Sequence, residues 1–222
     1  MLFRHFKWFA AVGLAVLVCA APAARAVPVP LSTLVAGGTK TCGDKFFNNF
    51  SYSFTGNMPA ASDVNVDCVT IAGNFGLEFQ GGFLDLPGGS TSDALIKYTV
   101  TVTTPGIFIV DAHIQGNPLV AGGTGAMIVV DSFVPDAPNT MSIFHIPGNP
   151  NSPQNTDSTI FATGYTTLHV QKDILGAAGT GAASMSFVDQ TYSQTAVPEP
   201  GTLGLLGIGL LGFAGYSWRR RC

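Results

Sequence analysis

Apolar and polar residues alternate with a period of two through most of the region between residues 27 and 196. In the segment IKYTVTVTT, the apolar residues Ile96, Tyr98, Val100 and Val102 alternate with lysine and threonine. This alternation is typical of a β-strand with one buried face, and threonine and valine favour such a pleated surface. No segment of this region has a convincing long period of 3.6 residues. The region is therefore expected to be all-β.

Turn signals rich in Gly, Pro, Asn and Asp divide the region into short segments. Several short strands between such turns predict an antiparallel β-sandwich of jelly-roll type. No internal repeat is visible, which argues against a solenoid or a propeller. Besides 96–103, the expected strands cover residues 46–54, 64–72, 75–80, 107–116, 126–134, 141–146, 160–171 and 184–192.

Pro105 and Gly106 supply a turn between two of these segments, 96–103 and 107–116. The two segments are expected to pair as a hairpin, because a proline-glycine turn reverses the chain between two alternating runs. The side chains of the second segment that are expected to enter the core are Phe108, Val110, Ala112 and Ile114.

The N-terminus has the features of a secretory signal peptide. Two basic residues precede an apolar run over residues 8–21, and Ala24 and Ala26 occupy the small-residue positions that a signal peptidase inspects. Residues 1–26 are therefore predicted to be a signal helix that the Sec translocon inserts and signal peptidase removes, so that Val27 begins the mature chain. An uncleaved anchor helix is the alternative.

The C-terminus, residues 197–222, combines three features. Val197 is followed by a proline-acid-proline triplet, then by 17 uncharged residues from 202 to 218, then by three arginines before Cys222. As a helix the uncharged segment would be about 25 Å long, nearly the thickness of a bilayer core. The arginines would hold its end inside by the positive-inside rule. The residues of the triplet and of the arginine cluster are Pro198, Glu199 and Pro200, and Arg219, Arg220 and Arg221.

Together these three features resemble the PEP-CTERM sorting signal of Gram-negative bacteria. In that family exosortase, a membrane cysteine enzyme, recognises the signal and removes the tail during export. The resemblance implies that the VPEP residues 197–200 are the recognition motif, that residues 202–218 form a single transmembrane helix, and that the arginines are the membrane stop. A plain anchor that is never cut is the alternative, and the pattern gives Cys222 no role.

The region between the two ends resembles PEP-CTERM passenger proteins more loosely. The segments TCGDKFFNNFSYSF and LHVQKDILGAAGTGAASMSFVDQTYSQ resemble early and closing segments of such passengers. Removal of the signal peptide and the sorting signal would leave residues 27–196, a length that predicts one passenger domain with its own core. The two resembling segments bracket this domain. The resemblance implies nothing about chemistry.

The charge and the cysteines of residues 27–196 limit the possible partners and the redox setting. The region contains four lysines, no arginine and twelve acids, a net charge of −8. Such a chain repels nucleic acid and anionic lipid, so nucleic-acid binding is not expected. Its two cysteines, Cys42 and Cys68, are expected to form a disulfide in an exported chain. The closed loop would contribute about 3 kcal/mol of stability.

Candidate catalytic groups are few. Asp111 and His113 share one strand face because they are two residues apart, but no further ligand or acid follows at useful spacing. A solvated strand face is the preferred interpretation, and His145 and His169 are interpreted as structural or surface residues. No nucleophile elbow G-x-S-x-G is present. The domain is therefore expected to be non-catalytic, with a secreted hydrolase as the less favoured class.

Two kinds of ligand are weighed against a purely structural role. Calcium would need loop carboxylates, and the candidates are Asp85, Asp93, Asp131, Asp136 and Asp157. No dense acidic run supports a site, so no cofactor is expected and calcium stays an alternative. For sugar binding, residues 27–196 contain no tryptophan. The available tyrosines are Tyr52, Tyr98, Tyr165 and Tyr192.

These observations lead to one functional hypothesis with one main alternative. The chain is expected to be a non-catalytic surface or extracellular-matrix protein of a Gram-negative bacterium, associated with exopolysaccharide. It would be secreted or held at the cell surface or outer envelope after transient anchoring in the inner membrane. A lectin-like or calcium-dependent carbohydrate-binding or adhesion module is the alternative.

Overall fold

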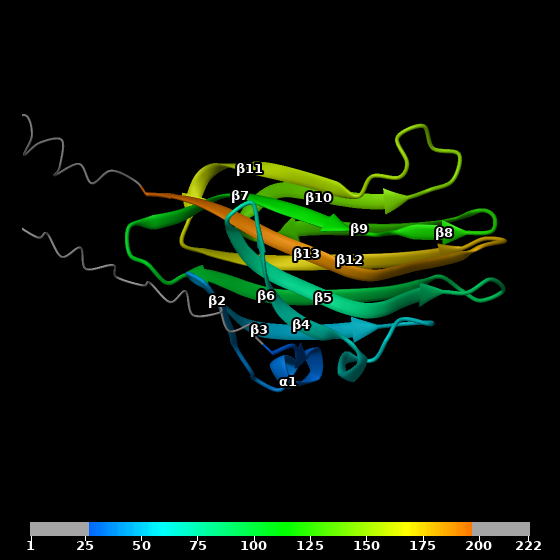
Figure 1. Ribbon diagram of the computed structural model, residues 1–222, viewed down its shortest axis with the longest axis horizontal. Coiled ribbons are helices and arrows are strands. Elements are labelled where there is room, and N and C mark those ends of the chain that lie inside the picture. The colour runs from blue at the N-terminus through cyan, green and yellow to red at the C-terminus, as the bar shows by residue number, and fades with distance from the viewer. Residues whose placement is uncertain (1–26, 197–222) are drawn as a thin grey trace, which may run out of the picture.

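The computed structural model describes residues 27–196, which fold into two antiparallel β-sheets with very little helix (Figure 1). The predicted signal peptide, residues 1–26, and the predicted sorting signal with its membrane segment, residues 197–222, lie outside the described residues. Within residues 27–196, no helix is long and apolar enough to cross a membrane. The elements are β1 (Val29–Pro30), α1 (Leu31–Val35), β2 (Lys40–Cys42), β3 (Lys45–Phe54), the 3₁₀ helix η1 (Ala61–Asp63), β4 (Asn65–Ile71), β5 (Asn74–Asp85), β6 (Ser92–Val102), β7 (Ile107–Gly116), β8 (Leu119–Ala121), β9 (Gly125–Phe133), β10 (Ala137–His145), β11 (Thr156–Tyr165), β12 (Thr167–Ala178) and β13 (Ala182–Ala196).

The two sheets pack face to face as a β-sandwich. The first, called sheet A, has the strand order β1-β4-β5-β13-β7-β11, with the short β8 also paired to β13. The second, called sheet B, has the order β10-β9-β12-β6-β3-β2. The sequence-based prediction of an antiparallel β-sandwich is confirmed at this level.

The predicted hairpin between residues 96–103 and 107–116 is wrong. β6 lies in sheet B between β3 and β12, whereas β7 lies in sheet A between β13 and β11. The turn at Pro105 and Gly106 therefore carries the chain from one sheet to the other. A turn motif specifies that the chain reverses, but it does not specify that the flanking strands exchange hydrogen bonds.

The predicted single strand over residues 160–171 is also wrong. β11 ends at Tyr165 in sheet A, and β12 begins at Thr167 in sheet B. This is a second crossing between the sheets, joined by Thr166 alone. The backbone N–H of Val102 donates to the Thr166 carbonyl over 2.9 Å, so the crossing is held against the end of β6.

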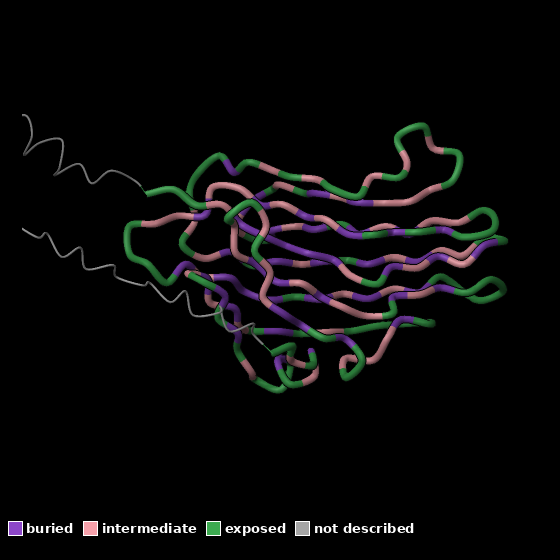
Figure 2. The backbone as a smooth tube through the Cα atoms, viewed as in Figure 1, coloured by how far each residue is buried: buried purple, intermediate pink, exposed green. Residues whose placement is uncertain are grey.

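Side chains from the inner faces of both sheets fill the core, and buried residues alternate with more exposed ones along the strands (Figure 2). The four predicted core residues of β6 are buried. In β7, however, Ile109 is fully buried, whereas Phe108 and Val110 are not. Val110 is an extra residue opposite β13, where Ser193 pairs with Asp111 and Gln194 with Ile109. This β-bulge reverses the inside-outside phase of the strand.

The predicted disulfide is present and joins the two sheets. Cys42 is the last residue of β2 in sheet B, and Cys68 lies in β4 of sheet A. Their Cα atoms are 5.4 Å apart, a common separation for a disulfide. The bond therefore ties one edge of the sandwich together.

Candidate binding groove on the outer face of sheet A

A groove with a volume of about 460 Å³ lies on the outer face of sheet A. Its floor is formed by outward side chains of β13, β7 and β11, and the tip of the β4–β5 hairpin forms one wall. In Figure 1 this hairpin tip lies over β7 and β13. The lining residues are Ile71, Ala72, Asn74, His113, Ile114, Gln115, Thr156, Asp157, Ser158, Asp189 and Thr191. This surface is called the sheet A groove below.

The register of three strands sets the order of polar side chains on the floor. Asp189 of β13 is paired with Glu78 of β5 on one side and with Gln115 of β7 on the other. Directly paired residues point to the same face of a sheet, so these three side chains form one row. The next row contains Thr191 between Gly76 and His113.

Gly76 allows β5 to lie close to β13 in the second row. A Cβ atom at this position would lie 1.8 Å from the backbone carbonyl oxygen of Gln190, a distance that no side chain can adopt. Only glycine allows β5 to approach β13 this closely. As a result, no side chain stands beside Thr191 on the β5 side.

Two carboxyl groups face each other in the first row. Asp189 is only 3% exposed, and Glu78 is partly buried. Burial raises the pKa of Asp189 to about 6; the amide of Gln115 opposes this shift, and the neighbouring carboxyl of Glu78 adds to it. Gln115 Nε2 donates to Asp189 Oδ2 over 2.7 Å, and Gln80 donates to Glu78. Among the described residues, nothing donates a hydrogen bond to Asp189 Oδ1.

His113 and Asp111 are in contact, as their spacing on one strand predicted. His113 Nε2 lies 3.0 Å from Asp111 Oδ1 and 3.1 Å from Ser193 Oγ. The backbone N–H of Ser193 also donates to Asp111 Oδ1. Asp111 therefore orients the imidazole, which is 40% exposed and lines the sheet A groove.

The other two histidines of the domain lie on strands of sheet B. His145 Nδ1 accepts the backbone N–H of Val120 over 2.9 Å, so this ring has a structural hydrogen bond. His169 Nδ1 lies 2.9 Å from Asp136 Oδ2, and its side chain is half exposed. Neither contributes to the sheet A groove.

The five acids considered for calcium are mostly not in loops. Only Asp136 lies in a turn; the other four belong to strands. Asp131 is fully buried against Lys172, and Asp85 accepts hydrogen bonds from the Ser92 hydroxyl and the Ala178 backbone. In the part of the chain that the structure describes, no group of three or more His, Cys, Asp or Glu is placed to hold a metal ion.

The tyrosines do not form a platform for sugar stacking. The hydroxyls of Tyr98 and Tyr192 lie 2.8 Å apart in the core, where both side chains are buried. Tyr52 donates to the Pro59 carbonyl and Tyr165 to the Asp136 carbonyl. None of these four tyrosines lines the sheet A groove.

Sequence reasoning missed Gln115, Asp189 and Thr191 of the groove lining, and also Glu78, which is paired with Asp189 on the neighbouring strand. Each of these residues is an ordinary outward polar residue of an alternating strand. Their proximity depends on β13 lying between β5 and β7, although these strands are far apart in the sequence. No local sequence signal encodes that neighbourhood.

Comparison with known proteins identifies a motif in the C-terminal segment. Residues 196–221 match the family model of the PEP-CTERM protein-sorting motif. The chain carries this sorting motif. The PEP-CTERM motif implies export to the cell envelope or surface of a Gram-negative bacterium, with exosortase as the processing partner. No curated protein matches the chain.

Two solved structures resemble parts of the PEP-CTERM chain. One is TmCBM61 in complex with beta-1,4-galactotriose, with 12% identity, a TM-score of 0.31, and coverage of 65% of this chain and 89% of that chain. The other is the enzymatically active domain of Bacteriophage CBA120 tailspike protein 4, with 12% identity, a TM-score of 0.33, and coverage of 65% of this chain and 19% of that chain. Both TM-scores are low, and neither likeness indicates what this chain binds.

Proposed function

We propose that this chain is an exported, non-catalytic protein of the cell surface or extracellular matrix that binds exopolysaccharide through the sheet A groove. The single observation that supports this role most directly is the groove itself, a polar depression on an exported β-sandwich. Its volume of about 460 Å³ falls within the range of about 300–1,000 Å³ typical of ligand sites.

The side chains of the groove suit a hydroxyl-rich ligand. The exposed Thr156 and Ser158 offer hydroxyls, and Gln115 offers an amide. Ile71 adds apolar atoms that can pack against the C–H groups of a sugar ring. The carboxyl of Asp189 on the floor, with that of Glu78 beside it on β5, disfavours anionic sugars by like-charge repulsion. We therefore assign the groove to neutral or amino sugars.

The proposed transit follows from the sorting motif and the N-terminal sequence. The Sec translocon exports the chain, signal peptidase cuts after Ala26, and the C-terminal helix holds the folded domain transiently at the inner membrane. Exosortase then removes the tail near the VPEP residues 197–200. The intact mass of the protein from its native host tests this path. We expect a soluble species that begins at Val27 and ends near Gly201, whereas a membrane species that keeps Cys222 would contradict it.

The jelly-roll assignment within the sandwich is supported by nested strand pairing. Pairs form between β5 and β13, β6 and β12, β7 and β11, and β9 and β10. The first strand of this set pairs with the last, the second with the second last, and so on inward. A long hairpin rolled up in this way is the topology of an eight-stranded jelly roll.

Glycan binding is tested with protein purified from its host and with neutral oligosaccharides released from that host's own extracellular polysaccharide. We expect saturable binding by calorimetry, weakened roughly tenfold by Gln115→Ala and by His113→Ala, since each removes one or two polar contacts. Lys97→Gln, on the opposite sheet, is the matched control and should bind normally. Binding that survives both groove variants would place the ligand elsewhere, and no binding by the parent protein would leave a purely structural matrix role.

A further inference from the structure

The lysines of the domain divide into two kinds. Three are buried and engaged with acids or with backbone oxygen: Lys40 is 8% exposed, Lys45 1% and Lys172 0%. Lys97 is exposed at the centre of sheet B and has no ion-pair partner within residues 27–196. Because residues 27–196 contain no arginine, Lys97 is the one exposed lysine or arginine on the described surface.

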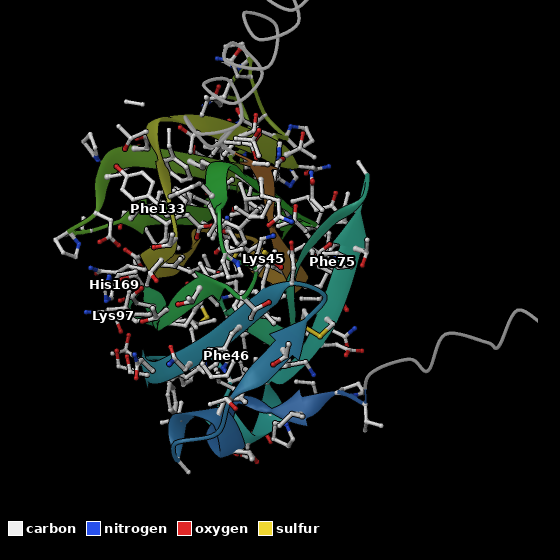
Figure 3. All side chains as sticks on the ribbon, turned by 90° about the vertical axis from the view of Figure 1, so that its left-hand side faces the viewer. Lys45, Phe46, Phe75, Lys97, Phe133 and His169 are labelled. Carbon is white, nitrogen blue, oxygen red and sulfur yellow. A yellow bond between two sulfur atoms is a disulfide. The ribbon has the colours of Figure 1, made fainter. Side chains whose placement is uncertain are left out.

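Lys97 does not stand on a flat surface. It lines a groove of about 300 Å³ on the outer face of sheet B, on the opposite side of the sandwich from the sheet A groove. Strand pairing places Ser51 of β3 and Gln171 of β12 on either side of it. In Figure 3, Lys97 and His169 lie next to each other at one side of the molecule, and both line this groove. It is called the Lys97 groove below.

A β-bulge in β3 shapes the groove beside Lys97. Asn48 pairs with Thr99 and Ser51 with Lys97, so β3 has one residue more than β6 between these pairs. Within the bulge, Asn49 has a φ of 54°, a left-handed conformation that is uncommon outside glycine. The distortion turns the Asn49 amide outward, where it donates to Thr99 Oγ1 over 3.3 Å. Bulges that re-aim a side chain are over-represented next to functional sites.

The acids closest to Lys97 on this face are already engaged. Asp136 Oδ2 accepts the backbone N–H of His169 over 2.6 Å and also contacts its ring. Burial, followed by the neighbouring carboxyl of Asp93, raises the pKa of Asp173 to about 6. Within residues 27–196, neither of these two acids forms an ion pair with Lys97. The Lys97 ammonium therefore keeps its hydrogen-bonding capacity for a ligand.

We propose that the Lys97 groove binds an acidic saccharide, with Lys97 pairing with the sugar carboxylate. Asn49, Ser51 and Gln171 supply neutral hydrogen-bonding groups for the hydroxyls around that carboxylate. A single cation among neutral polar groups fits one carboxylate per sugar ring. It does not fit the dense phosphates of nucleic acid, which need clustered lysine and arginine. The inference does not depend on the sheet A groove, because the two sites lie on opposite faces.

The test compares two sugars that differ only in the charged group. The host-purified protein is titrated with a galacturonic-acid trimer and with the same trimer after reduction of its carboxyls to alcohols. We expect saturable binding of the acidic trimer. The reduced trimer should bind at least roughly tenfold more weakly, because it loses one charge-assisted contact. Binding of the acidic trimer should also weaken as salt is raised.

Variants of Lys97 separate charge from packing. Lys97→Gln should weaken binding of the acidic trimer roughly tenfold, whereas Lys97→Arg should retain most of it. Lys97 is exposed, so neither substitution should move the unfolding midpoint. Asp63→Asn, at an exposed residue that lines neither groove, is the control and should bind the acidic trimer normally. If the acidic and reduced trimers bind equally, or if Lys97→Gln binds like the parent, the proposal is overturned. Equal competition by acetate or inorganic phosphate would likewise overturn it, by showing a simple anion site.

Discussion

Two adjacent residues of β13, Asp189 and Gln190, point to opposite faces of sheet A and enter two different polar clusters. Gln190 joins an interior cluster, where Lys172 Nζ lies 2.7 Å from both carboxylate oxygens of Asp131 and 3.1 Å from Gln190 Oε1. Asp189 lines the sheet A groove and pairs with Glu78 of the neighbouring strand β5. The first cluster balances its charges and the second does not.

The balance of charge explains why the two clusters have different consequences. In the interior, burial lowers the pKa of Lys172 and raises that of Asp131, but each group favours the charged form of the other. In the groove, burial and Glu78 both work against the charged form of Asp189. A buried pair of opposite charges can stabilise the folded protein, whereas two neighbouring acids reduce its stability at neutral pH. Such sites are typical of binding or catalytic surfaces.

The largest expected effect follows from breaking the interior pair. Lys172→Met leaves the Asp131 carboxylate buried without a cation, and we expect a loss of about 3–5 kcal/mol in the free energy of unfolding. Urea unfolding at neutral pH measures this. The double variant Lys172→Met with Asp131→Leu should recover most of the loss, because no lone charge then remains. A single variant that loses under about 1 kcal/mol would contradict the view that this cluster stabilises the fold.

The disulfide is the next largest contribution and affects the two faces unequally. Replacing Cys42 and Cys68 by alanine should reduce the free energy of unfolding by about 3 kcal/mol, since the unfolded chain gains freedom. Cys68 lies in β4, whose hairpin with β5 forms a wall of the sheet A groove. Hydrogen exchange should therefore increase more at the β4–β5 hairpin than around Lys97. Equal increases at both places would show that the disulfide does not hold this wall specifically.

The comparison of the two clusters also shows what the sequence could and could not predict. Alternation predicted the strands, and the buried positions of β6 followed directly from it. The bulge at Val110 could not be predicted, because its one extra residue is required only by the pairing of β7 with β13.

The interior pair and the groove were both outside the reach of sequence reasoning. Asp131 was placed near a loop, and the structure buries it in β9 because Lys172 is its partner on β12. Asp189 becomes a site residue only because two distant strands flank β13. Sequence periodicity encodes which side of a strand a residue occupies, whereas strand order, which decides its neighbours, depends on the energy of the whole sandwich.

The smallest expected effect is a gain in stability when the Asp189 carboxyl is removed, whereas breaking the interior pair should cause a loss. Asp189→Asn should stabilise the protein at pH 7 by about 1 kcal/mol, because the introduced amide can accept from Gln115 and donate to Glu78 without a second charge. The pKa of Asp189 is about 6 in the folded protein, against an ordinary value of 3.8. Between these pH values the folded protein keeps a proton that the unfolded chain has lost. The free energy of unfolding should therefore fall as the pH rises from about 4 to 6 and stay at the lower value above it.

Asp189→Asn should reduce this fall, while the exposed Asp63→Asn should leave it unchanged. Urea unfolding at a series of pH values measures both variants. Because the substitution removes a carboxylate from the groove floor, it should also weaken any binding of amino sugars while leaving the Lys97 groove unaffected. A gain in stability together with a loss of ligand binding would show that the acid pair is maintained for the ligand at the expense of the fold. A loss of stability would mean that Asp189, like Asp131, belongs to the structural charges of the sandwich.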